Sequence, residues 1–134
     1  MKKSVLVIPC SGIGKPFGSI ARDATFCVCD ELRSGKADTL CLFLLVMSDE
    51  EARHKVASSK CITIDGCPLA CSRNNIERSG GKVAAEFRVM DLLRENRDLK
   101  PRTVTFLDED GEKLSKMLAE KIAAKVDELW EESD

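Results

Sequence analysis

The sequence of 134 residues has no tyrosine, one tryptophan and one histidine, and its charges nearly cancel. With 21 Lys and Arg against 23 Asp and Glu, it lacks the basic excess that phosphate backbones attract. Its five Phe and one Trp also provide few surfaces for base stacking. These absences argue against nucleic acid as a partner.

Long hydrophobic runs are missing as well. The longest, Leu40 to Met47, is far shorter than the ~20 residues that span a membrane. The apolar stretch near the N-terminus is too short for a signal peptide, and no small-residue cleavage site follows it. The sequence therefore predicts a cytoplasmic protein without a membrane partner. Its length and its 43% hydrophobic content predict a single domain over 1–134.

Histidine chemistry is disfavoured, because the only histidine, His54, lies in a charged stretch typical of a solvated helix face. Cysteine, in contrast, is abundant. Seven cysteines are an odd number in a chain that otherwise has the composition of an intracellular α/β domain. In a reducing compartment, such cysteines indicate metal ligation or thiol chemistry more often than disulfides.

The hydrophobic pattern alternates between strand-like and helix-like segments. A polar connection over Asp91–Lys100, with room for a helical turn, and a turn over Asp108–Gly111 complete the prediction. Strands that alternate with helices predict a Rossmann-like, three-layer α/β fold, a mostly parallel sheet with helices on both faces. The expected strands are Ser4–Pro9, a segment from Asp38 through Leu42, Lys60–Asp65, Lys82–Val89 and Thr103–Leu107. The expected helices are Ser19–Arg33, Ser48–Ser59, Pro68–Arg78 and one whose apolar face runs from Leu114 to Leu129.

Four cysteines fall at or near the carboxyl ends of the expected strands, where open α/β sheets gather their functional groups. Cys10 follows the first strand, Cys41 lies in the second, and Cys67 follows the third, with Cys71 four residues beyond it. If Pro68 opens a helix, the last two sulfurs share one side of its first turn. Four converging thiolates would suit tetrahedral zinc, and Cys61 is the alternative to Cys41 if the pleat turns the latter away.

The remaining motifs carry weaker predictions. Cys27 and Cys29 are expected to serve only as small side chains of the first helix. The loop from Gly12 to Gly18 lacks the spacing of known phosphate-binding loops, although its N–H groups would still suit an anion. Asp65 is expected either to cap the turn after its strand or to hold the cysteine loop. No exposed apolar stripe indicates a partner-binding module.

The run Ile64–Cys71, which contains Asp65-Gly66-Cys67, resembles the DGC-domain family when taken together with Cys10-Ser11-Gly12. The resemblance extends over roughly Val5 to Val89 and leaves the last helix outside. It implies a zinc ion held by four cysteines, matched here to Cys10, Cys41, Cys67 and Cys71. It implies no established reaction.

The leading hypothesis is a cysteine-ligated Zn²⁺ protein with a structural, carrier or sensing role, because four thiolates leave no open position for water. A second hypothesis is a thiol redox or sulfur-transfer enzyme, in which Cys67 is the nucleophile and Cys71 the resolving thiol. A third is an iron–sulfur cluster on the same cysteines.

Overall fold

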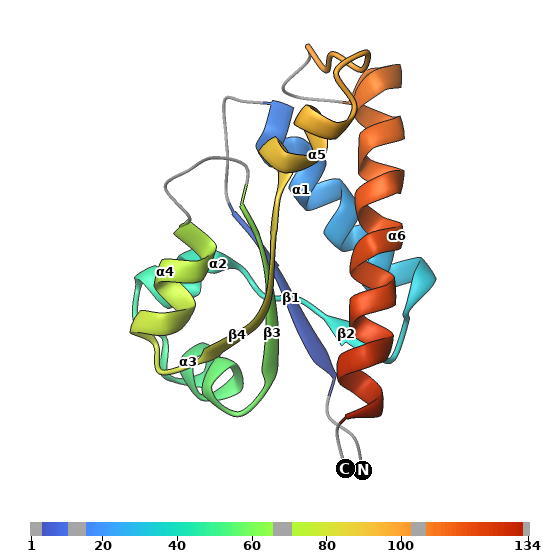
Figure 1. Ribbon diagram of the computed structural model, residues 1–134. Coiled ribbons are helices and arrows are strands. Elements are labelled where there is room, and N and C mark those ends of the chain that lie inside the picture. Colours follow the sequence, from blue (N-terminus) through green and yellow to red (C-terminus); the bar gives the residue numbers. More distant parts are fainter. Residues whose placement is uncertain (1–3, 11–15, 66–70, 103–106, 133–134) are drawn as a thin grey trace.

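The computed structural model describes residues 4–10, 16–65, 71–102 and 107–132 (Figure 1). In these ranges strands and helices alternate along most of the chain. The elements in order are β1 (Val5–Pro9), α1 (Pro16–Cys27), a π-helical turn η1 (Val28–Leu32), β2 (Ala37–Asp38), α2 (Leu42–Val46), α3 (Glu50–Ala57), β3 (Lys60–Asp65), α4 (Cys71–Arg78), β4 (Lys82–Arg88), α5 (Val89–Glu95) and α6 (Glu109–Glu131).

The described strands form one parallel sheet in the order β2-β1-β3-β4. β1 and β3 pair from Leu6 opposite Cys61 to Pro9 opposite Ile64, and β4 pairs with the other side of β3. Parallel neighbours need crossover connections, and the helices between the strands supply them. The predicted α/β class with a parallel sheet is confirmed.

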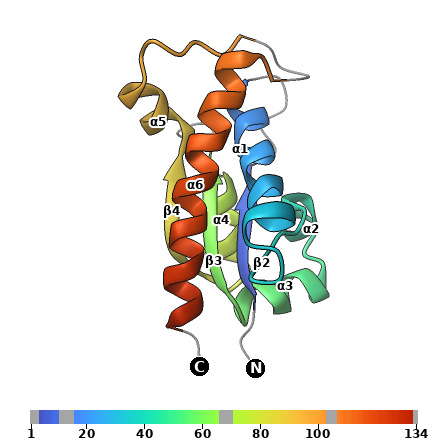
Figure 2. The same ribbon diagram turned by 90° about the vertical axis from the view of Figure 1, so that its right-hand side faces the viewer.

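Helices cover both faces of this sheet. Figure 1 shows α2, α3 and α4 on one side and α1 and α6 on the other, and Figure 2 shows α1 and α6 side by side. The side chains of β1 follow the pleat, since Leu6 and Ile8 pack with α2–α4 whereas Val5 and Val7 pack with α1 and α6. The predicted three layers are therefore present.

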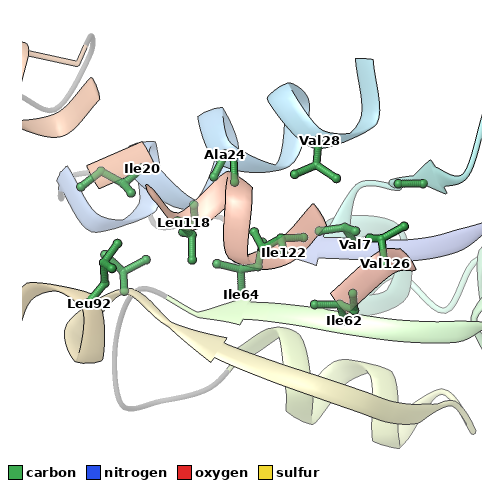
Figure 3. Close-up of a cluster of buried hydrophobic side chains, with 14 of the residues drawn as sticks. Val7, Ile20, Ala24, Val28, Ile62, Ile64, Leu92, Leu118, Ile122 and Val126 are labelled. Carbon is green, nitrogen blue, oxygen red and sulfur yellow. The ribbon is translucent and has the colours of Figure 1, made fainter. Parts of the chain in front are cut away.

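The larger core lies between the sheet and the α1–α6 layer. The apolar positions of α6 recur every three or four residues, so one stripe of this helix is buried along most of its length. A two-pronged ion pair between Arg33 and Asp127, with N–O distances of 2.7 and 2.8 Å, ties η1 to α6. Figure 3 shows this core, formed by Val7, Ile62 and Ile64 of the sheet, Ile20, Ala24 and Val28 of α1 and η1, Leu92 of α5, and Leu118, Ile122 and Val126 of α6.

The second strand is the largest correction to the predicted fold. It was expected to extend through Leu42, but β2 ends at Asp38 and Leu42 begins the short helix α2. Cys41 is therefore not a strand residue, and it lies exposed at the N-cap of α2. A helix is favoured here because it buries Leu42 and Leu45 together, as their spacing of three residues requires.

Three smaller predictions are also corrected. Asp49, not Ser48, caps α3, because its carboxylate accepts the N–H of Ala52 at 2.9 Å. The helical turn expected within Asp91–Lys100 is longer and begins earlier, as helix α5 from Val89, and Asp108 caps α6 instead of opening a turn. The strand expected over Thr103–Leu107 falls almost entirely outside the described residues.

The described helices do not include one that combines the length and the apolar character needed to cross a membrane.

Candidate functional site

The carboxyl edge of the sheet brings together three chain segments, the end of β1, the end of β3 and the start of α4 (Figure 1). The N–H of Cys10 donates to the carbonyl oxygen of Ile64 at 2.9 Å, which extends the β1–β3 ladder by one residue. The Oδ1 atom of Asp65 accepts the N–H of Ser72 at 2.9 Å. The first hydrogen bond holds Cys10 beside Ile64, and the second ties the residue after Cys71 to Asp65, so each joins a cysteine-bearing segment to the end of β3.

Asp65 occupies the centre of this edge and is almost completely buried. Burial raises the pKa of its carboxyl group, while the N–H groups of Ser72 and Arg73 oppose that shift. Its Oδ2 atom and the hydroxyl of Thr63, two residues earlier on the same face, have no hydrogen-bond partner among the residues described. Asp65 therefore caps the first turn of α4, whereas the turn that directly follows its strand lies outside the described residues, so neither of the two roles expected for it is tested.

Cys10 lies buried at the end of β1. Leu6 and Ile8 face the α2–α4 layer, and the same alternation assigns position 10 to that layer. Position 65 faces the same layer, since it continues the alternation that begins at Cys61. Cys10 and Asp65 thus belong to one face of two paired strands.

Cys71 is the first residue of α4 and is exposed. Its own carbonyl oxygen accepts the side-chain amide of Asn75 at 2.8 Å, and Asp65 holds the adjacent residue Ser72. The start of α4 is therefore fixed by the strand end beneath it, and the Cys71 thiol remains accessible to solvent or to a ligand.

Cys41 lies on a separate element. It precedes α2, its side chain makes no capping hydrogen bond, and it is exposed. The layer that holds α2 is the layer that holds α4, and Arg78 at the end of α4 donates to the carbonyl oxygens of Leu45 and Val46. Cys41 and Cys71 therefore start two helices of one layer.

Cys67 lies outside the described residues, as does most of the loop from Gly12 to Gly18 that was considered for anion binding. Within the described ranges, no group of three or more His, Cys, Asp or Glu side chains is arranged to hold a metal ion. Cys10, Cys41 and Cys71 lie within these ranges and do not form such a group, and the four-cysteine site stays a prediction.

Cys61, the alternative ligand, is placed away from this edge. It pairs with Leu6, four positions before Cys10, which corresponds to about 13 Å along the strand. Its Sγ atom lies 3.6 Å from the carbonyl oxygens of both Val56 and Ser59. Burial raises the pKa of this thiol from 9.0 to about 11, so it is protonated at neutral pH and behaves as a core side chain.

Cys27 and Cys29 are half-buried beside the α1–α6 core, as expected for cysteines without a site role. Burial, with Glu31 as the next cause, raises the pKa of Cys27. Burial followed by the charges of Asp38 and Asp30 raises the pKa of Cys29 to about 12. Both thiols disfavour the ionised form that a metal or a nucleophilic reaction requires.

Sequence reasoning missed the part played by Thr63 and Ser72. Neither residue belongs to a cysteine motif. The two-residue period of β3 puts Thr63 on the same face as Asp65. A helix that begins near Cys71 leaves the N–H of Ser72 without a partner in the helix, and Asp65 accepts it. The buried polar cluster beneath the site could have been found from these two periodicities.

Comparison with protein-family models matches the chain to the DGC domain over residues 6–126. No curated protein and no solved structure matches the chain. The matched region extends well beyond Val89 and includes most of α6, so the expectation that the last helix lies outside the resemblance was wrong. A match over this much of the sequence means that the chain belongs to the DGC-domain family.

Proposed function

We propose that this protein binds one zinc ion through the thiolates of Cys10, Cys41, Cys67 and Cys71 at the carboxyl edge of its sheet. The observation that carries the proposal is the pair of hydrogen bonds from Cys10 to Ile64 and from Ser72 to Asp65, each 2.9 Å long. They tie Cys10 and the start of α4, which carries Cys71, to a strand end whose continuation contains Cys67.

The chemistry of the donors fits this ion. Thiolates are soft ligands that select Zn²⁺, Cu⁺ or iron–sulfur clusters over Mg²⁺ and Ca²⁺. Asp65 has a different part, because zinc with four thiolates is net negative and does not neutralise a carboxylate. Its Oδ1 atom holds the start of α4, which carries Cys71.

Each residue then has a definable part. Cys10 and Cys71 would bind from the strand end and the helix start, and Cys41 from the segment before α2. Asp65 is a positioning residue, since it fixes the first turn of α4. When bound, the ion would cross-link these segments, and full thiolate ligation favours a structural, carrier or sensing role over hydrolysis. Such ligation suits the reducing conditions of the cytoplasm.

A second candidate function is thiol redox or sulfur-transfer chemistry. The exposure of Cys71 at the start of α4 favours it, because an accessible thiol at a helix N-terminus is suited to reaction. In this case Cys67 would be the nucleophile and Cys71 the resolving thiol. An iron–sulfur cluster would use the same cysteines as zinc and would absorb visible light.

Elemental analysis of anaerobically purified protein tests the proposal. We expect one zinc per chain in the wild type, loss of most of it in Cys67→Ser and Cys71→Ser, and full retention in the matched control Cys27→Ser. Iron in the purified protein, together with visible absorbance, would instead indicate an iron–sulfur cluster on these cysteines. Absence of metal from the wild type would reject the metal site and leave the thiol chemistry.

Asp65→Asn should stabilise the metal-free fold and also strengthen zinc binding. Asparagine keeps the oxygen that caps Ser72 and removes a buried charge, so we expect the free energy of unfolding of metal-free protein to rise by about 1 kcal/mol. Zinc affinity should rise about tenfold, a coupling of about 1.4 kcal/mol, because zinc with four thiolates has a net negative charge and the variant removes a like charge near it. Urea unfolding and a competition titration measure the two effects.

The control for this variant is Asp49→Asn, which changes another capping aspartate, at the exposed start of α3. It should leave zinc affinity unchanged. Equal zinc affinity in Asp65→Asn and wild type would show that the Asp65 charge has no part in binding.

A further inference from the structure

Helix α2 exposes an apolar surface that the sequence pattern did not indicate. We call it the α2 patch, and it consists of Phe43, Leu44, Val46 and Met47. Phe43 is 58% exposed and Met47 62% exposed, and these four are most of the large apolar side chains exposed in the described chain. Exposed apolar groups that gather in one place indicate an interaction surface. The expectation that no exposed apolar stripe is present was therefore wrong.

The position of the α2 patch is fixed by the packing of helix α2. Leu42 and Leu45 anchor α2 in the core it shares with α3 and α4, and Arg78 donates to two carbonyl oxygens at its C-terminal end, at 3.1 and 3.3 Å. With one side of a five-residue helix held in this way, its other side chains must point outward. The exposure of the patch thus follows from how α2 is held.

Charges of both signs border the patch from two different helices. Arg78 of α4 contacts the end of α2, and Glu50 and Glu51 begin α3 just after Met47. The N–H of Asp49 donates to the carbonyl oxygen of Leu44 at 2.9 Å, which keeps that acidic turn beside α2. Among the described residues, neither Arg78 nor the two glutamates has an ion-pair partner.

We infer that the α2 patch is the interface with a second copy of this chain. In a two-fold dimer the same surface meets itself, so an apolar centre bordered by both an arginine and glutamates is complementary to its own copy. Arg78 of each copy would face the acidic start of α3 in the other. An anionic membrane fits less well, because Glu50 and Glu51 would be repelled by its headgroups.

The solution mass tests this inference, and it does so independently of the metal. At high micromolar concentration, sedimentation equilibrium of the protein as purified should give twice the chain mass of 14.8 kDa. Phe43→Ser combined with Met47→Ser should weaken dimerisation more than tenfold and return the mass to that of one chain. Both side chains are exposed, so the fold should survive, as circular dichroism and an unchanged zinc content would verify.

The matched control is Phe26→Ser, which removes a phenylalanine that is 51% exposed on α1, in the opposite layer, and it should remain dimeric. Reversing the rim charges with Glu50→Arg and Glu51→Arg should also weaken the dimer. A wild-type mass of 14.8 kDa at every concentration would overturn the inference. So would a dimer that the patch substitutions leave intact, or a monomer that sediments with anionic lipid vesicles through this patch.

Discussion

Removal of the proposed zinc ion should lower the melting temperature of this protein by about 12 to 20 °C. An ion that binds only the folded chain stabilises it by RT ln(1 + [L]/Kd), which is about 4.1 kcal/mol when free zinc is a thousandfold above Kd. For a domain of this length each kcal/mol corresponds to about 3 to 5 °C. Thermal unfolding with excess chelator and with excess zinc measures the difference.

The proposed ligands explain why this effect should be large. The four ligands, Cys10, Cys41, Cys67 and Cys71, come from separate parts of the sequence, so the unfolded chain does not hold them together. The ion therefore binds only the folded chain and stabilises it. Cys71→Ser should unfold at the same temperature with and without chelator. If chelator also leaves the melting temperature of the wild type unchanged, the protein has no stabilising metal.

Gly81→Ala is expected to lower the free energy of unfolding by about 2 to 3 kcal/mol. A Cβ atom at this position would lie 2.4 Å from Cγ1 of Val56 and 2.9 Å from Cγ2 of Ile76. Both are buried side chains of the core between α3 and α4, so neither can move aside easily. Urea unfolding measured by circular dichroism gives the difference directly.

This glycine also completes the end of the helix that begins at Cys71. The N–H of Gly81 donates to the carbonyl of Ile76 and that of Gly80 to Glu77, with Gly80 at φ +87°, which is the Schellman arrangement. The matched control is Gly35→Ala, where φ is +85° and no atom lies within 4 Å of the added Cβ. It should cost only the strain of the left-handed backbone, about 1 kcal/mol. Equal losses at Gly35 and Gly81 would show that packing against Val56 is unimportant.

The central strands and the last helix were predictable because burial imposes a regular pattern on them. β3 lies in the middle of the sheet with helices on both faces, and its predicted bounds, Lys60–Asp65, agree with the structure. In α6 one stripe faces the core, so leucine and isoleucine recur at helical spacing. A strand that is buried on both faces, or a helix that is buried along one stripe, has a hydrophobic pattern from which its type can be predicted.

Helix α2 was missed for the opposite reason. Only Leu42 and Leu45 enter the core, while Phe43, Leu44, Val46 and Met47 are apolar and exposed. An apolar run without a period does not distinguish a buried strand from a helix. If the α2 patch is covered by a second copy of the chain, its side chains are apolar because of that contact, and they follow no period of α2 itself.

The candidate site was predictable in its placement and less so in its details. The rule that functional groups follow the carboxyl ends of parallel strands correctly placed Cys10 at the sheet edge, and Cys71 begins a helix at the same edge. The predicted position of Cys41 at a strand end was wrong, because the second strand ends at Asp38. The Asp65–Ser72 hydrogen bond joins residues seven apart, and that contact depends on how α4 packs on the sheet.

Site-resolved alkylation with and without zinc tests the four-cysteine site most directly. In metal-free protein at pH 8, the exposed thiols of Cys41 and Cys71 should react readily, while Cys61, with its pKa near 11, should react slowly in every condition. One equivalent of zinc should slow Cys10, Cys41, Cys67 and Cys71 together by more than about tenfold. If Cys41 and Cys71 react at the same rates with zinc as without it, the proposed site is wrong.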